Sequence, residues 1–483
     1  MKLRYIEEPS LQFGTNQHIC PKGGIVSYNP FDIGNVRPEK IVIGMIGKSE
    51  SIDIVANWVK SCKYEIQGKQ PKKGKKLNTN LFPGFCGFNS SIGFKSEIAF
   101  DDTYLRKINN SDIDDILNKN QNLDDVIKLV AELYLAEIKY LSKNKNPDVI
   151  LCVINEDLIK HLIEATLEPQ SDEELITVKD EEAEEAASEK EKNFRRYLKA
   201  KAMKYNIPIQ IVRDRIAEPT GEMQDPATIA WNFFTALYYK ASGTPWALVR
   251  KDMSETTCYA GLSFYKSRDR KTTQTSIAQI FNELGKGVIL RGEEIVKPKD
   301  DNIPHLKSEQ AFNLLDLSLR EYHDAVKQTP KRLVLHKTSN YNEAEIEGFK
   351  QAAKKYFIHQ VDLVTIIDSD FRLYRENAYP PLRGTQLSFE EKRHLLYTRG
   401  SVPYYETYTG KYIPSPIDVR LFEYDESPNL ICEEILALTK MNWNNTQFDR
   451  RLPITIECAR NVGDILKYLD EDDVMQLKYS FYM

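Results

Sequence analysis

The order of its apolar segments limits the fold of this chain more than any other sequence feature. In the first half, short apolar runs typical of strands alternate with segments whose apolar residues recur every three or four positions, as on a helix face. Strands are expected at 40–48, 147–155 and 207–214, and helices at 51–62, 122–141, 194–205 and 225–240. Strands that alternate with helices predict a parallel sheet covered by helices.

The second half of the chain has a different order. Three consecutive strand-like runs lie at 256–267, 274–284 and 287–295, and a helix, a strand, a helix and a strand follow at 308–327, 332–339, 343–356 and 361–368. Three antiparallel strands followed by α/β alternation is the order of an RNase H-like layer. The predicted fold class is α/β, a Rossmann-like domain at 41–245 followed by an RNase H-like domain at 246–483, with residues 1–40 packing against this core.

The charge of the chain is distributed unevenly. Twelve acids and two lysines between Glu164 and Glu191 give −10, so the remainder of the chain carries +5 of the total −5. We interpret the acidic run as a solvated insertion, and the basic remainder leaves room for a surface that binds phosphate. The seven cysteines lie far apart, and no apolar run is long enough to span a membrane, so we expect a cytoplasmic protein with reduced thiols.

Several segments in fixed order carry a resemblance to a known family. They are EEPSLQFG and NPFD near the start, then IPIQ, the helix ending in YYKASGTPW, AGLSF, RLVLHKTSNYNEAEIEGF and MNWNNTQFDRRLPITIECA. This order resembles the MID and PIWI domains of Argonaute proteins, and nearly the whole chain is covered. At 483 residues there is no room for the N and PAZ domains of a long Argonaute, so the chain looks like a short prokaryotic Argonaute. The resemblance makes 41–245 a MID domain and 246–483 a PIWI domain.

In this family the MID domain holds the 5′-phosphate of a guide strand, which requires several cationic or amide donors around one dianion. The resemblance assigns this pocket to Arg195, Lys199, Gln210 and Lys240. Arg195 and Lys199 are four residues apart and therefore share a helix face. Further nucleic-acid candidates are Arg196, Lys201, Asn232, Arg250 and Lys266. The alternative interpretation is an exposed cationic helix that only balances the acidic run.

The chain ends in the apolar residues SFYM, which suggests a buried end. Argonautes often use the C-terminal carboxylate and a divalent cation to bridge guide phosphates. The resemblance therefore makes Met483 a candidate ligand of Mg²⁺, which prefers oxygen ligands. A tail that packs for stability alone is the alternative.

A PIWI domain that cuts nucleic acid places acidic residues around two metal ions. In the corresponding positions this chain has Ser263, Thr338 (or Lys337) and, after LPITI, which we interpret as a strand, Arg460. Serine and threonine bind magnesium weakly, and arginine repels it. We therefore expect no catalytic residues and no nuclease activity in this chain.

The resemblance implies a role in a prokaryotic immune complex. A 5′-phosphorylated guide RNA pairs with complementary single-stranded DNA of an invader, and this pairing activates a partner protein with an APAZ region. The partner carries a TIR or sirtuin-like NADase that depletes NAD(P) and halts the infected cell, and the two proteins form a heterodimer or, on activation, a higher oligomer.

Two other functions remain open at this point. One is a guide-directed endonuclease with non-standard metal ligands such as Asp368 or Glu457. The other is an α/β protein with a small-molecule site and no nucleic acid. Cleavage with manganese would favour the first, and failure to bind a 5′-phosphorylated oligonucleotide would favour the second.

Overall fold

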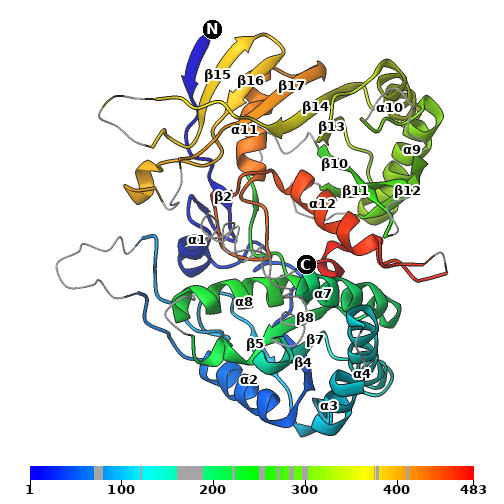
Figure 1. Cartoon of the computed structure of the whole chain (residues 1–483). Helices are drawn as coiled ribbons and strands as arrows, with labels where there is room; N and C mark the ends of the chain where they lie inside the picture. Colours follow the sequence, from blue (N-terminus) through cyan, green and yellow to red (C-terminus); the bar gives the residue numbers. More distant parts are fainter. Residues whose placement is uncertain are drawn as a thin grey trace, which may run out of the picture.

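The computed structural model describes residues 1–69, 80–119, 122–159, 189–219, 224–249, 256–268, 272–281, 288–295, 303–374, 376, 380–408, 413–470 and 472–483. These residues form two lobes, each built around one sheet, and the last residue of the chain lies between the lobes (Figure 1). The predicted acidic insertion at 164–191 lies almost entirely outside the described residues, as does Arg250.

The first lobe contains a sheet of five strands in the order β5-β4-β7-β8, with β6 paired to β4. Every strand pair in it is parallel. The buried apolar runs predicted as strands form β4, β7 and β8, as expected for a sheet covered on both faces. The bounds are β4 Lys40–Gly47, β5 Glu97–Ala99, β6 Leu105–Lys107, β7 Val149–Ile154 and β8 Ile209–Arg213.

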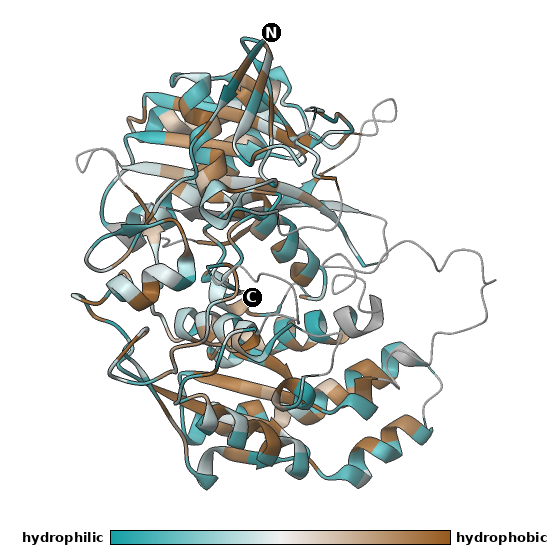
Figure 2. Cartoon of the chain, turned by 90° about the vertical axis from the view of Figure 1, so that its left-hand side faces the viewer, coloured by the Kyte–Doolittle hydropathy of each residue, from teal (hydrophilic) through white to brown (hydrophobic). Residues whose placement is uncertain are grey.

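Helices cover both faces of this sheet. The core on one face joins α2 and α8 to β4 and β7, and the core on the other face joins α4 and α7 to β7 and β8. Figure 2 shows the apolar strands of this sheet enclosed between the helices. The bounds are α2 Ser49–Ser61, α3 Asn110–Lys119, α4 Leu123–Asn144, α7 Glu189–Ala202 and α8 Pro226–Lys240.

The second lobe contains a sheet of nine strands in the order β1-β15-β16-β17-β14-β13-β10-β11-β12. Strands β10, β11 and β12 are antiparallel, and β13 and β14 then continue parallel to β10. The bounds are β1 Lys2–Tyr5, β10 Thr257–Lys266, β11 Thr273–Phe281, β12 Leu290–Ile295, β13 Arg332–Lys337, β14 Gln360–Asp368, β15 Thr385–Glu390, β16 Arg393–Leu396 and β17 Ile417–Glu423. The predicted fold class, an α/β chain with a second layer of this order, is confirmed.

Two pairs of helices cover the nine-stranded sheet. One core packs α9 and α10 on β10, β13 and β14, and another packs α11 and α12 on the opposite face. The bounds are α9 Ser308–Val326, α10 Glu343–Lys355, α11 Pro428–Leu438 and α12 Ile454–Leu466.

Helix α12 corrects the interpretation of LPITI as a strand. Pro453 occupies the N-cap position, and Ile454, Cys458 and Val462 are buried at a spacing of four residues. Burial of such apolar side chains contributes about 1.5–3 kcal/mol each and outweighs the strand propensity of Ile and Thr. The interpretation was wrong because five residues are too few to reveal the helical period.

The N-terminal segment connects the two lobes. Its strands β2 (Leu11–Gln12) and β3 (Gln17–His18) form a small sheet with β9 (Ala247–Leu248), and the helix α1 (Pro21–Tyr28) follows. Buried Glu8 accepts hydrogen bonds from Arg383 at 2.8 Å and from Lys440 at 2.9 Å, and these two cations lower its pKa although burial opposes them. This buried ion network fixes the N-terminal segment on the second lobe.

No helix in the described part of the chain is long and apolar enough to cross a membrane.

Candidate nucleic-acid interface

Two helices bring the predicted phosphate-binding side chains to the boundary between the lobes. Helix α8 begins as predicted, with Asp225 accepting a hydrogen bond from the main-chain N–H of Thr228 and proline at the first helical position. It ends at Lys240, whose positive charge suits a helix C-terminus. Helix α7 carries Arg195 and Lys199, and Figure 1 shows both helices beside the chain terminus.

Lys240 lies at the centre of this arrangement. Its side chain is buried, and its Nζ donates to Gln210 Oε1 on β8 and, at 3.1 Å, to the main-chain oxygen of Met483. Met483 is itself buried at the end of the chain, after the short 3-10 helix Tyr479–Phe481. The structure thus joins three of the predicted site residues by direct hydrogen bonds.

Arg195 and Lys199 complete the cationic group. Burial, followed by the positive charges of Arg195 and Arg196, lowers the pKa of Lys199 to about 7. Burial, with Lys199 as the largest repulsive charge, holds the pKa of Lys240 well below its ordinary value. Each cation thus disfavours the charge of the next, and an anion bound among them would favour the charged form of both lysines.

The cluster gathers charges of one sign around Lys240. Lys240 donates to an amide oxygen and to the main-chain oxygen of the last residue, while the positive charges of Lys199 and Arg195 repel its own. A buried cation is stable only when an anion or strong acceptors compensate for its lost hydration. A phosphate dianion would supply that charge and would accept hydrogen bonds from all three cations.

Two of the additional nucleic-acid candidates, Arg196 and Lys201, form ion pairs with acidic residues near the end of the chain. Arg196 forms an ion pair with Asp464 of α12, and Lys201 contacts Asp470 at 2.6 Å and Asp473 at 2.5 Å. These pairs tie α7 to the second lobe. These pairs could not be predicted from the sequence, because nothing in the pattern of the C-terminal acids identifies their partners.

Asn232 and Lys266 also lie apart from the cluster. Asn232 Oδ1 accepts from the main-chain N–H and from the Oγ1 of Thr446, each at 3.0 Å, and so connects α8 to a loop of the second lobe. Lys266 is exposed at the end of β10.

The oxygen atoms in the cluster suit magnesium only in part. Gln210 Oε1 and the main-chain oxygen of Met483 lie next to the Lys240 ammonium, whereas Mg²⁺ requires about six oxygen ligands in octahedral geometry. The surrounding cations would repel a bare ion. The residues therefore fit Mg²⁺ only together with bound phosphate, in which case these two oxygens would hold it and the ion would neutralise phosphate charge.

The predicted degenerate nuclease positions lie on the second lobe under α12. Gly261 of β10 faces this helix so closely that a Cβ atom there would lie 2.1 Å from the main-chain oxygen of Thr455. Ser263 follows on the same face of β10 and is buried. Leu262 pairs with Lys337, so Ser263 and Thr338 are the next residues along two adjacent parallel strands. Arg460 is on α12 with its side chain exposed.

The acidic residues considered as alternative metal ligands are held in ion pairs. Asp368 contacts Arg451 at 3.2 Å, and Glu457 accepts from Arg450 and, at 2.9 Å, from Asn442. His336 contacts Thr455 Oγ1 at 2.8 Å, and burial, followed by Arg332, lowers its pKa to about 3, so it is neutral at pH 7. Within the described residues, no group of three or more His, Cys, Asp or Glu side chains could hold a metal ion.

Comparison with solved structures identifies the architecture of the chain. Clostridium butyricum Argonaute bound to a guide DNA and a 19-mer target DNA matches 98% of this chain with a TM-score of 0.65 and 17% identity, over 54% of its own length. Marinitoga piezophila Argonaute in complex with a 5′ OH guide RNA matches 100% of this chain with a TM-score of 0.54 and 12% identity, over 59% of its length. Drosophila Piwi matches 100% with a TM-score of 0.57 and 11% identity, over 56%.

The chain thus has an Argonaute-like fold of MID and PIWI type, and it spans a little over half the length of these solved structures. No protein-family model and no curated protein sequence matches it. The resemblance found in the sequence is confirmed at the level of the fold.

Proposed function

We propose that this chain binds the 5′-phosphate of a guide RNA in the pocket formed by Arg195, Lys199, Gln210 and Lys240. The observation that carries this proposal is the gathering of Arg195, Lys199 and Lys240, whose like charges, together with burial, lower the pKa of both lysines. Charge-assisted hydrogen bonds to phosphate are about twice as strong as neutral ones. Binding of phosphate would raise the pKa of both lysines and offset the free energy that their burial costs.

The guide would then select its target by base pairing, and the protein would contact the backbone of the paired strands. The proposed target is single-stranded DNA complementary to the guide. We further propose that the chain does not cut this target. The family resemblance aligns Ser263 and Thr338 with the carboxylates that hold metal ions in a cutting PIWI domain, and Asp368 and Glu457 are held by arginines.

The rest of the proposal concerns the partner protein and the role of the complex in the cell. We propose that the chain forms a cytoplasmic heterodimer with an APAZ-containing protein that carries a TIR or sirtuin-like NADase. Target pairing would activate this partner, deplete NAD(P) and stop the infected cell. This part rests on the family resemblance, as does the proposal that the C-terminal carboxylate of Met483 would hold Mg²⁺ together with the guide phosphates.

The first test is the nucleic acid that purifies with this chain when it is expressed with the protein encoded beside it. Extracted material is labelled at its 5′ ends with and without phosphatase treatment. Short RNAs that label only after phosphatase carry 5′-phosphates and support the proposal. NAD(P) loss after addition of complementary DNA then tests the role of the partner.

Direct titration distinguishes the phosphate pocket from general affinity for RNA. The chain should bind a 5′-phosphorylated RNA more tightly than the same RNA with a 5′-hydroxyl. Equal affinity for the two RNAs would refute the phosphate pocket. Cleavage of a paired DNA target in manganese that is lost in Asp368→Asn or Glu457→Gln would establish the endonuclease alternative.

A further inference from the structure

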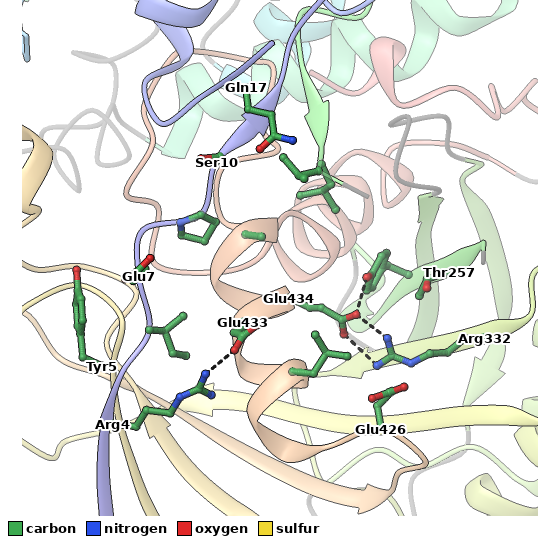
Figure 3. Close-up of a pocket in the computed structure, with 17 residues that line it drawn as sticks. Arg4, Tyr5, Glu7, Ser10, Gln17, Thr257, Arg332, Glu426, Glu433 and Glu434 are labelled. Atoms are coloured by element: carbon green, nitrogen blue, oxygen red, sulfur yellow. Dashed lines mark hydrogen bonds and ion pairs between the residues drawn. The ribbon is translucent and has the colours of Figure 1, made fainter. Parts of the chain in front are cut away.

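A cavity of about 670 Å³ lies beside the N-terminal segment, on the α11 face of the nine-stranded sheet. Residues Arg4 to Ser10 run along one side of it and α11 along another, and Arg332 reaches in from β13 (Figure 3). Both chain views place the N-terminus at the far end of the second lobe from Met483 (Figures 1 and 2). This region is therefore separate from the phosphate pocket.

The charged side chains that line the cavity are predominantly acidic. Two arginines, Arg4 and Arg332, face four glutamates, which gives a formal charge of −2. Arg4 is bound to Glu433 at 2.6 Å, and Arg332 is shared between Glu434 at 2.5 Å and Asp362 at 2.6 Å. The lining glutamates are Glu7, Glu426, Glu433 and Glu434. The excess negative charge makes a cationic group the complementary ligand.

Strand β1, which borders this cavity, is an edge of the sheet within the described residues. Its partner β15 is antiparallel, and the main-chain N–H of Ile6 donates to Gly384 at 2.9 Å. Because hydrogen-bonded and non-bonded pairs alternate in such a ladder, the main-chain groups of Arg4 also face β15. The N–H and C=O groups of Leu3 and Tyr5 then face outward and can pair with another strand.

Leu3, which does not line the cavity, gives this edge an exposed apolar side chain. Leu3 pairs with Leu387 of β15. Leu3 is 69% exposed, and Met1 and Tyr5 are also exposed. An edge strand with exposed apolar side chains is a site for pairing with another chain, and proteins normally protect or use such edges.

We propose that β1 binds an extended segment of a second protein that pairs with its outer edge. Side chains alternate across an added strand, so they must match both faces of the sheet. On one face apolar side chains would cover Leu3, and on the other a lysine or arginine would enter the acidic cavity. This mode of recognition, strand addition with a pocket for an alternate side chain, recurs in peptide-binding proteins. The inference does not depend on guide binding.

The test uses the full chain without guide and a short fluorescent peptide in which valine alternates with lysine. A matched peptide alternates valine with glutamate. We expect saturable binding of the lysine peptide, with the glutamate peptide weaker by at least about tenfold, or about 1.4 kcal/mol. Amide hydrogen exchange should slow at Leu3 and Tyr5 when the lysine peptide binds.

Three variants separate the parts of the surface. Leu3→Pro removes an outward N–H and leaves the hydrogen bonds to β15 in place. Glu426→Lys places a cation in the cavity. Each variant should lower the affinity for the lysine peptide about tenfold. Leu3→Asp keeps the backbone donor and tests the apolar face, and exposed Val36→Asp is the control that should bind normally. Unchanged binding in both Leu3→Pro and Glu426→Lys, or no preference between the peptides, would overturn the proposal.

Discussion

The proposed phosphate pocket and the region of the expected nuclease positions differ in how their charges are arranged. In the pocket, like charges are gathered, and Arg195, Lys199 and Lys240 repel one another. In the second lobe, opposite charges are paired, Asp368 with Arg451 and Glu457 with Arg450. Clustered charges of one sign with shifted pKa values are typical of a site for a charged ligand, whereas opposite charges in pairs are typical of structure.

The largest effect should come from breaking a balanced pair. Glu345 and Lys337 are fully buried, and Lys337 Nζ lies 2.6 Å from both carboxylate oxygens of Glu345. Glu345→Gln leaves the ammonium without its counter-charge and should lower the free energy of unfolding by about 3–5 kcal/mol. Denaturant titration measures this change.

Exposed Glu343 lies on the same helix and provides the control. Glu343→Gln should lower the free energy of unfolding by less than about 1 kcal/mol, because it removes only an interaction with the helix dipole. Equal losses in the two variants would show that Lys337 and Glu345 do not form a structural pair.

The second largest effect should be a loss of affinity for RNA without a loss in the free energy of unfolding. Lys240→Met keeps the aliphatic length but removes the ammonium, so affinity for 5′-phosphorylated RNA should fall about 10–100-fold, as for loss of one charged hydrogen bond of about 1.5–3 kcal/mol. The free energy of unfolding should not fall, because a repelled, buried charge has been removed. Titration with RNA and denaturant unfolding measure the two quantities.

Lys354→Met serves as the matched control for this variant, because Lys354 is exposed on α10. It should leave the preference for a 5′-phosphate unchanged. A loss of stability in Lys240→Met without a change in phosphate preference would assign Lys240 to structure.

The third effect is a pH dependence. Lys199 has a pKa of about 7 in the free chain, and a bound phosphate would raise it, so binding takes up a proton. Affinity should therefore be highest below pH 7 and fall up to tenfold per pH unit as pH rises from 7 toward the pKa of the complex. Below about pH 6 the phosphate itself takes up a proton, which sets the lower limit.

Measuring the affinities for 5′-phosphate and 5′-hydroxyl RNA at each pH isolates the pH dependence that is due to the phosphate. In Lys199→Met the slope above pH 7 should become shallower, because only Lys240 then remains to take up a proton on binding. An unchanged slope in this variant would assign the titration to a group other than Lys199.

The smallest effect should come from the ion pairs between the lobes. Arg196 and Asp464 are partly exposed, and such pairs contribute about 0–1 kcal/mol. Asp464→Asn should change the free energy of unfolding by less than about 1 kcal/mol and leave the phosphate preference unchanged. A large loss of phosphate affinity would instead make α12 part of the guide site.

Local patterns predicted most of the fold. The periods of the apolar residues located β10, β13, β14 and α8 to within about two residues, because each element carries its full pattern. Helix α12 was missed because the strand-forming residues of its first turn were read without the period of the whole segment. Sheet edges such as β1, whose strand has only four residues, leave no pattern to detect.

Only part of the candidate site could be predicted from the sequence. Arg195 and Lys199 could be grouped because four residues separate them on a helix. The contact between Lys240 and Met483 spans 243 residues, and that between Arg196 and Asp464 spans 268. No local pattern encodes such distances, so Lys240 and Met483 could be named only through the family resemblance and Asp464 could not be predicted. The assignment of the pocket to phosphate stays a prediction.

The contact between Lys240 and Met483 also has a consequence for folding kinetics. Contacts between residues far apart in sequence form late, because the loop between them must close first. Gln210 and Lys240 can fold with the first lobe, but the oxygen of Met483 reaches them only after the second lobe has folded and docked. Guide loading would therefore report that the whole chain has reached its native state, and a chain arrested halfway would carry an incomplete pocket.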